Sequence, residues 1–278
     1  MRILPKIGEN EERMHPDLLD KINESKGCEI QLLTDIPDIA FSNAMKSLEK
    51  FNLNIDYIIV HVPFSMIMLD MVYRNDNYRY HYVKFINRVL DYSETNKVRI
   101  DIVTHVNPSY SQFNALGTED FLMGILAAIN RSRVRLLIEN SIISLNEDDN
   151  AESTEEAIFR QIRHPHLKFC LDLCHLQASE NVLQKSRCLT QGLLENISNI
   201  HFSATLDNDG YRNKKSTHGR AHRCLDDVLN DLRYLQNKGI DIEGVNIVLE
   251  INEDDYVNRP DLLREIHYFN EINTYRLI

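Results

Sequence analysis

The sequence predicts an α/β protein that forms one (β/α)8 barrel domain over residues 1–278. Eight short apolar runs rich in β-branched residues recur along the chain, and each has the length and composition of a buried parallel strand. The length of 278 residues suits such a barrel, which typically needs about 250 residues. The strand-like runs cover residues 2–7, 28–33, 57–62, 98–106, 134–139, 167–173, 197–203 and 245–251.

The segments between these runs carry helix signals. Apolar residues recur with helical spacing over residues 38–51, and Thr118-Glu119-Asp120 opens a second helix of this kind. Further helices are predicted at residues 153–162, 180–194, 225–235 and 260–269. The polar stretches 70–80, 146–155 and 207–223 are longer than average connections, and we expect them to form loops over one mouth of the barrel.

The alternation of strand and helix favours a closed barrel over an open sheet. It implies parallel strands joined by right-handed crossovers, and eight such units without an evident linker close most naturally on themselves. The alternative is an open doubly wound sheet. That fold usually carries a Gly-rich phosphate-binding turn after an early strand, and the sequence has none.

Composition limits the classes of function. The formal charge of -11 argues against broad attraction to nucleic acid, whose binding depends on Lys and Arg contacts to phosphate. The apolar runs are strand-sized and the N-terminus lacks the features of a signal peptide, so we expect a cytoplasmic protein without a membrane contact. The five cysteines are scattered without a CxxC pair, and we interpret them as packing residues rather than a disulfide framework. No particular oligomeric state is favoured.

Residue types that commonly bind metals, namely His, Asp and Glu, stand at the ends of six consecutive strand-like runs. The C-terminal ends of barrel strands meet at one mouth, so these side chains are expected to converge. Imidazole and carboxylate groups suit zinc and manganese, and a carboxylate at the end of an apolar strand is costly to bury unless it is paired or bound to a cation. The sequence therefore predicts a divalent metal site. The candidates are His61, His105, Glu139, Asp172, His175, His201 and Glu250.

Each candidate also has an ordinary structural interpretation. A single buried histidine is usually a hydrogen-bonded core residue, and a carboxylate at a strand end often pairs with an arginine or caps the next helix. The occurrence of all seven at one mouth is what favours the metal site.

Six short motifs carry a resemblance to a known family. In order, they are similar to that family's His-Ala-Pro-Tyr, His-Pro-Gly-Ser, Ile-Glu-Asn-Thr, Ile-Asp-Thr-Cys-His, His-Leu-Asn-Asp and Leu-Glu-Thr. The matching segments of this sequence are His61-Val-Pro-Phe64, His105 with Pro108-Ser109, Ile138-Glu139-Asn140-Ser141, Leu171-Asp172-Leu173-Cys174-His175, His201-Phe-Ser-Ala and Leu249-Glu250. The family that the chain resembles is that of the abasic-site endonucleases that include endonuclease IV, within the wider xylose-isomerase-like barrels, and the resemblance spans nearly the whole chain.

The resemblance implies a cluster of three metal ions, with zinc as the first expectation and manganese as the second. Glu139 would bridge two ions. Asp172, His201 and Glu250 would complete the site of one ion, and His61 with His105 the site of the other.

The third ion would be held by His175 and an Asp-x-His pair in the loop after the seventh strand. There His218 fits the histidine, but Ser216 stands where the family has aspartate, and the Gly-x-Gly that usually follows is missing. His222 is a possible substitute ligand. The ordinary interpretation of His218 and His222 is a solvated loop.

The activity implied by this family is phosphodiester hydrolysis at abasic sites in DNA. Paired ions would activate a water and stabilise charge on the phosphate, with Glu139, Glu250 and His175 at the reacting centre. Phe64 would wedge near the duplex. The nearest basic residues lie in the same polar loop, which also has the ordinary interpretation of a charged surface loop; they are Arg212, Lys214, Lys215, Arg220 and Arg223.

The other branch of these barrels, the sugar isomerases and epimerases, implies a second activity. It needs one ion held by Glu139, Asp172, His201 and Glu250, with the two glutamates moving a proton on a sugar or sugar phosphate. A residue like His175 would touch the sugar. This alternative leaves His61 and His105 unexplained, whereas the nuclease interpretation leaves the acidic charge and the lost aspartate unexplained. A degenerate barrel that serves as a binding protein is a third possibility.

Overall fold

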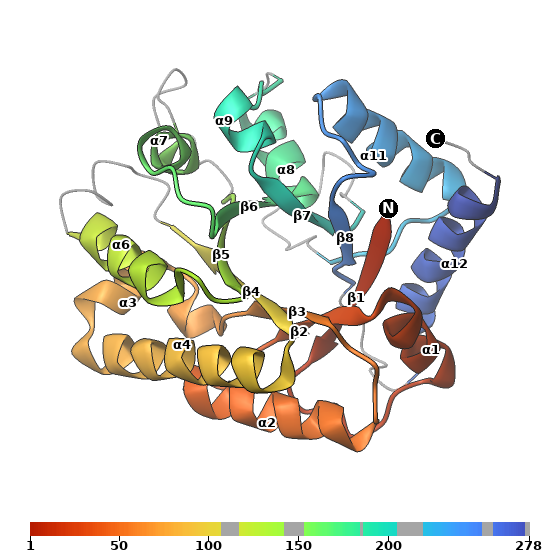
Figure 1. Cartoon of the computed structure of the whole chain (residues 1–278). Helices are drawn as coiled ribbons and strands as arrows, with labels where there is room; N and C mark the ends of the chain where they lie inside the picture. The colour runs from red at the N-terminus through yellow and green to blue at the C-terminus, as the bar shows by residue number, and fades with distance from the viewer. Residues whose placement is uncertain (107–116, 142–152, 184–185, 205–218, 252–257, 276–278) are drawn as a thin grey trace.

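Eight parallel strands close into a barrel in the order of the sequence, as predicted (Figure 1). The computed structural model describes residues 1–106, 117–141, 153–183, 186–204, 219–251 and 258–275. Every predicted strand is present, and its ends lie within two residues of the prediction. The strands are β1 (Arg2–Gly8), β2 (Gly27–Gln31), β3 (Tyr57–His61), β4 (Arg99–His105), β5 (Val134–Glu139), β6 (Leu167–Asp172), β7 (Ile197–Phe202) and β8 (Asn246–Leu249).

Helices surround the barrel and cover the outer face of the strands (Figure 1). Their apolar sides and the outward side chains of the strands form the large continuous core. The helices are α1 (Pro16–Ser25), α2 (Pro37–Lys50), α3 (Leu69–Arg74), α4 (Asp76–Asn96), α6 (Thr118–Ile129), α7 (Thr154–Gln161), α8 (Leu173–Leu183), α9 (Gln191–Leu194), α11 (Leu225–Asn237) and α12 (Pro260–Tyr275), with a 3-10 turn at Phe64–Met66.

One predicted loop and the start of one predicted helix are wrong. The stretch 70–80 is helical rather than a loop, because it holds most of α3 and the start of α4, where the Asn75 side chain caps the backbone N–H groups of Asn77 and Tyr78. The helix expected at 180–194 instead begins at Leu173, directly after β6, and only the short α9 follows. Of the other predicted loops, residues 146–152 and 207–218 lie outside the described residues, and residues 154–155 belong to α7.

The inside of the barrel is arranged in layers, as the alternation of strand side chains requires. The middle layer is an apolar cluster separate from the outer core, formed by Leu4, Tyr57, Ile59, Val103, Leu137, Cys170 and Val248. Polar groups lie on both sides of it. At the N-terminal end of the strands, the Tyr57 hydroxyl donates to Asp101 at 2.5 Å and the Arg135 Nε donates to Asp101 at 2.8 Å. At the C-terminal end lie the predicted metal ligands.

Two further expectations were drawn from composition. None of the five cysteines forms a disulfide. Across the described parts of the chain, no helix combines the length and the apolar character needed to cross a membrane.

Candidate metal centre

The strand ends bring six of the predicted ligands together at the mouth. His61, His105, Glu139, Asp172, His201 and Glu250 are all buried, with at most 6% of each residue exposed. Their possible ligand atoms form two groups, within each of which every pair of atoms lies within 4.8 Å. One group is His61, His105 and Glu139, and the other is Glu139, Asp172, His201 and Glu250. Glu139 belongs to both groups, as the resemblance implied.

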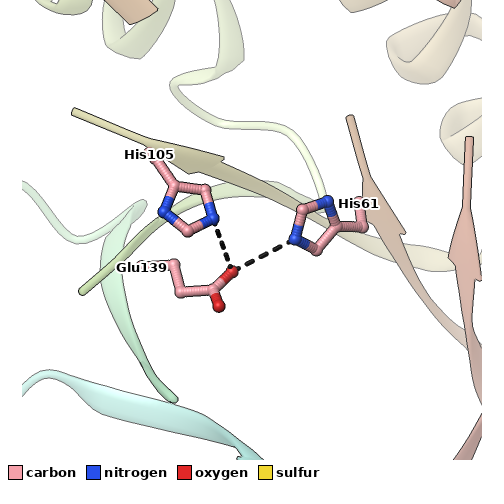
Figure 2. A group of neighbouring side chains, drawn as sticks. All are labelled: His61, His105 and Glu139. Atoms are coloured by element: carbon pink, nitrogen blue, oxygen red, sulfur yellow. Dashed lines mark hydrogen bonds and ion pairs between the residues drawn. The ribbon is translucent and has the colours of Figure 1, made fainter. Parts of the chain in front are cut away.

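The first group has two imidazoles that face one carboxylate oxygen (Figure 2). The Nε2 atoms of His61 and His105 each lie 3.2 Å from Oε2 of Glu139. The other ring nitrogen of His61, Nδ1, lies 3.1 Å from the carbonyl oxygen of Val62, which accepts a hydrogen bond when Nδ1 carries the hydrogen of the ring. In the neutral ring, Nε2 then presents a lone pair to the carboxylate. A cation between the two atoms satisfies both of them.

The second group is centred on His201. Its Nδ1 lies 3.2 Å from Glu139 Oε1 and 3.2 Å from Glu250 Oε2. Its Nε2 lies 2.8 Å from Oε2 of Glu29. Because a carboxylate accepts the Nε2–H, a ring that gives up its second proton to make room for a metal ion would turn the Nδ1 lone pair toward Glu139 and Glu250. This is the orientation that a metal-binding histidine needs.

Two charged residues at this site were missed in the sequence. Lys6 on β1 contacts Oε1 of Glu250, and its Nζ lies 3.0 Å from Oε1 of Glu29 on β2. Both residues are buried. The sequence did contain a signal for both residues, because Lys6 and Glu29 each place a charge at an inward position of an apolar strand, where a charge is costly unless it is paired.

The mutual influence of these charges appears in their pKa values. Burial lowers the pKa of His201, but nearby Cys170, Glu29 and Glu139 outweigh burial and hold that pKa well above its ordinary value. Burial raises the pKa of Glu139, and the neighbouring His201 and His105 reverse this and hold it well below the ordinary range. Without a metal ion between them, His201 and Glu139 therefore each favour the charged form and stabilise each other as an ion pair.

The balance of permanent charge favours divalent cations. Four buried carboxylates, those of Glu29, Glu139, Asp172 and Glu250, lie at this end of the barrel. Lys6 is the cation in contact with two of them. Burial lowers the pKa of Lys6, but Glu250 and Glu29 raise it above its ordinary value, so Lys6 stays charged. The remaining negative charge and the nitrogen and oxygen donors fit zinc or manganese.

Cys170 lies closer to the ligands than its interpretation as a packing residue suggested. It belongs to the apolar middle layer, which agrees with packing. Its Sγ also forms a group with donor atoms of Glu139 and His201, all within 4.8 Å of one another. Burial raises the pKa of the Cys170 thiol to about 12.

His175 lies beside the two groups rather than within either. Its Nδ1 lies 2.8 Å from the carbonyl oxygen of Asn140 and 3.9 Å from carboxylate oxygens of both Glu139 and Asp172. Its backbone N–H donates to Asp172 Oδ1 at 2.6 Å, so Asp172 also holds the first turn of α8. His218, the expected partner of His175 in a third ion site, lies outside the described residues, as does Ser216, which stands where the family has aspartate.

The suggestion that His222 replaces the missing aspartate is wrong. Both of its ring nitrogens are engaged away from the mouth, Nδ1 with Glu265 at 2.8 Å and Nε2 with Asp231 at 3.0 Å. The ring stacks on Phe202 with the centroids 5.0 Å apart. His222 thus ties the end of the loop after β7 to α11 and α12. The contact with Glu265 joins residues 43 positions apart, so no local pattern indicated it.

The remaining predicted contacts to DNA are only partly described. Arg220 and Arg223 are exposed, and the backbone of Arg220 pairs with that of Ala204 after β7. Arg212, Lys214 and Lys215 lie outside the described residues. Phe64 begins the 3-10 turn after β3, and its side chain is likewise not described.

No family model matches the chain, and no curated protein does. The fold does match solved structures. The TTHB071 protein from Thermus thermophilus, soaked with ZnCl2, has a TM-score of 0.58 and 17% identity over 98% of this chain and 99% of that chain. The 3-keto-D-glucoside 4-epimerase YcjR from E. coli has a TM-score of 0.56 and 14% identity over 99% of both chains.

A third match is the D-psicose 3-epimerase from Clostridium cellulolyticum H10 with D-tagatose. Its TM-score is 0.52, at 13% identity over 98% of both chains. A protein described as a xylose isomerase domain protein from Planctomyces limnophilus also matches, with a TM-score of 0.54 at 9% identity. Likeness at these identities shows a shared barrel fold and confirms that part of the resemblance. Membership of the abasic-site endonuclease family stays a prediction.

Proposed function

We propose that this chain is a divalent-metal-dependent enzyme that moves a proton on a carbon of a sugar or sugar phosphate, as an isomerase or epimerase. One observation carries the proposal: the carboxylates of Glu139 and Glu250, from the non-neighbouring strands β5 and β8, converge on Nδ1 of His201 at 3.2 Å each. With Asp172 they form a four-ligand group. An ion bound there would polarise adjacent substrate oxygens and acidify the neighbouring C–H.

The chain's own residues would then carry out the proton transfer. One of the two glutamates takes the proton from the substrate carbon. In epimerisation the other glutamate returns a proton to the same carbon, and in isomerisation a proton is returned to the neighbouring carbon. His61 and His105 both face Oε2 of Glu139 and hold that carboxylate in one orientation.

The comparisons lend more support to this proposal than to DNA cleavage. Among the matching folds, several solved structures are named as sugar epimerases, including the 3-keto-D-glucoside 4-epimerase and the D-psicose 3-epimerase. The formal charge of -11 also suits a small sugar better than a polyanion. Zinc is our first expectation for the ion and manganese the second.

Phosphodiester hydrolysis at abasic sites in DNA is the second candidate, and the first group of ligands favours it. His61, His105 and Glu139 form a second place for an ion, because the Nε2 atoms of both histidines lie 3.2 Å from Oε2 of Glu139. Two ions that share a carboxylate are suited to in-line displacement at phosphorus. The sugar proposal uses these histidines only to hold Glu139.

Counting bound ions and assaying both substrates on the same preparation separates the candidates. The chain is loaded with zinc or manganese and its metal content measured, then incubated with a panel of ketoses in D2O and with an abasic-site oligonucleotide. The sugar proposal expects one tightly held ion, solvent deuterium at the substrate carbon and no incision. Two ions with strand incision, and no exchange into any sugar, would replace it with the second candidate.

The His61→Ala and His105→Ala variants sharpen this test. If the sugar proposal is correct, both variants keep their metal, because the four-ligand group is intact, and they keep part of their exchange activity, because only the contacts that orient Glu139 are lost. If hydrolysis is correct, both lose one ion and the incision activity together. His267→Ala, at an exposed histidine on α12, is the matched control and should behave as the unaltered chain.

A further inference from the structure

The ring of His201 is held from behind by a carboxylate that takes no part in either ligand group. Oε2 of Glu29 lies 2.8 Å from Nε2 of His201, whereas Nδ1 on the opposite side of the ring faces Glu139 and Glu250. Both His201 and Glu29 are fully enclosed, with side chains that are 0% exposed. Water therefore cannot replace Glu29 as the partner of Nε2.

Glu29 is itself fixed by Lys6. The ammonium group lies 3.0 Å from Oε1 of Glu29 and also contacts Oε1 of Glu250. A buried carboxylate without a cationic partner would tend to take up a proton and lose its charge. Lys6 supplies that partner from the neighbouring strand β1, with Lys6 and Glu29 paired in register.

These contacts form one connected network that supports the candidate metal ligands. It runs from Lys6 through Glu29 to His201, and Lys6 also contacts Glu250. A charged acceptor on Nε2–H fixes which nitrogen bears the proton, sets the ring orientation and makes Nδ1 a stronger donor. Neither candidate reaction assigns a role to Lys6 or Glu29, yet burying both charges is costly without a compensating role.

We propose that Glu29, held by Lys6, is a positioning residue that sets the metal affinity of the mouth by fixing His201. The inference rests on the metal site of the proposed function but not on which reaction occurs there. Loss of such an outer partner typically weakens metal binding by about 10–100-fold.

The test measures zinc affinity by chelator competition and the visible absorption of the cobalt-loaded protein, so it needs no substrate. In Glu29→Gln we expect zinc affinity to fall by about 10–100-fold and the cobalt spectrum to change, because the orientation of His201 is no longer fixed by a charge. Glu29→Asp keeps the charge and should recover part of the affinity.

Glu9→Gln is the matched control. Glu9 is also 0% exposed and follows β1 closely, but it accepts hydrogen bonds from the backbone of Leu33 and Thr34 instead of contacting a ligand histidine. It should leave zinc affinity and the cobalt spectrum unchanged. Circular dichroism confirms that each variant is folded, and if Glu29→Gln is not, Glu29→Asp against Glu9→Asp repeats the comparison with shorter side chains.

The outcomes are distinguishable. Equal zinc affinity in Glu29→Gln and the unaltered chain overturns the positioning role alone, as does an equal loss in Glu29→Gln and Glu9→Gln. A chain that binds no divalent ion overturns the metal site and this inference together. Zinc binding that depends on Glu29 without any sugar exchange or strand incision supports the inference and refutes the proposed function.

Discussion

The two ends of the barrel interior both bury ionisable side chains, but they differ in how the charge is balanced. At the N-terminal end, Asp101 is paired with the guanidinium of Arg135 and accepts a hydrogen bond from Tyr57. Its charge is matched within the protein. At the mouth, Lys6 contacts two of the four buried carboxylates, and three histidines turn nitrogen atoms toward the carboxylates.

The comparison distinguishes a network whose charges the protein balances itself, around Asp101, from the network at the mouth, where a bound ion could complete the balance. A buried carboxylate is stable when a cation and hydrogen-bond donors complete its surroundings, as they do for Asp101. Where lysine and arginine do not match the carboxylates, as at the mouth, protonated histidine or a bound metal ion would supply the balance. Burial alone therefore does not indicate a site, whereas burial with unmatched charge does.

The largest expected effect would come from Glu139→Gln. Because Glu139 is the only residue common to both metal-ligand groups, we expect zinc binding at either position to fall below detection. Metal content after dialysis measures this. Glu155→Gln is the control, since Glu155 is buried near the same strand and accepts from the backbone of Ser141. Unchanged zinc content in Glu139→Gln would contradict the view that the carboxylates of the mouth, unlike Asp101 at the other end, bind metal.

Asp101→Asn should affect stability instead of metal binding. It leaves the Arg135 guanidinium without its carboxylate, and breaking a buried pair in this way costs about 3–5 kcal/mol. Denaturant unfolding measures the loss, and zinc affinity of the folded variant should be unchanged. Asp91→Asn, at an exposed position on α4, provides the reference. A weaker zinc site in folded Asp101→Asn would contradict the separation of the two ends.

The sequence predicted the barrel well because each strand carries its own apolar signature. It failed at α4 and α8, whose starts lack the expected pattern. A polar segment around Asn75 looked like a loop, and α8 begins directly at Leu173 because Asp172, taken as a ligand, also accepts from the backbone of His175. A residue with two roles conceals the helix start.

The site was predicted only as far as strand ends could show it. Parallel strands deliver their C-terminal residues to one mouth, so His61, His105, Glu139, Asp172, His201 and Glu250 followed from topology. Lys6 and Glu29 lie inside strands, and their pairing depends on the register of β1 with β2 and on barrel closure. Single strands do not encode such contacts.

His222 is a third case, in which a charged group outside the barrel is matched locally. Burial lowers its pKa, but hydrogen bonds to Asp231 and Glu265 reverse this and raise the pKa from 6.5 to about 9. The protonated form is thus favoured in the folded state. The shift corresponds to about 3 kcal/mol of stability, fully present below pH 6.5 and lost as the pH rises through about 9.

His222→Gln should remove that pH dependence. We expect the free energy of unfolding of the unaltered chain to exceed that of the variant by the largest margin near pH 6 and by a smaller margin near pH 10, because the raised pKa of His222 stabilises the fold only while the ring is protonated. Urea unfolding at both pH values measures the difference. The exposed His267→Gln serves as control. Equal margins at the two pH values would show that folding does not raise the pKa of His222.

The smallest effect concerns Cys170, at the boundary between the apolar middle layer and the mouth. Its Sγ packs in the inner core and also lies within 4.8 Å of donor atoms of Glu139 and His201. Sulfur is a softer donor than oxygen, so any contribution to the ion would favour zinc over manganese.

We therefore expect Cys170→Ser to weaken zinc binding by less than about tenfold, because loss of a residue that only supports a metal ligand typically weakens binding by about 10–100-fold. Manganese affinity should be unchanged. Competition titrations with both ions measure this. Cys174→Ser is the matched control, because Cys174 is also buried but contacts Ser203 at 3.1 Å. Equal changes in zinc and manganese affinity in Cys170→Ser would show that the thiol only packs in the apolar middle layer and is not part of the metal site.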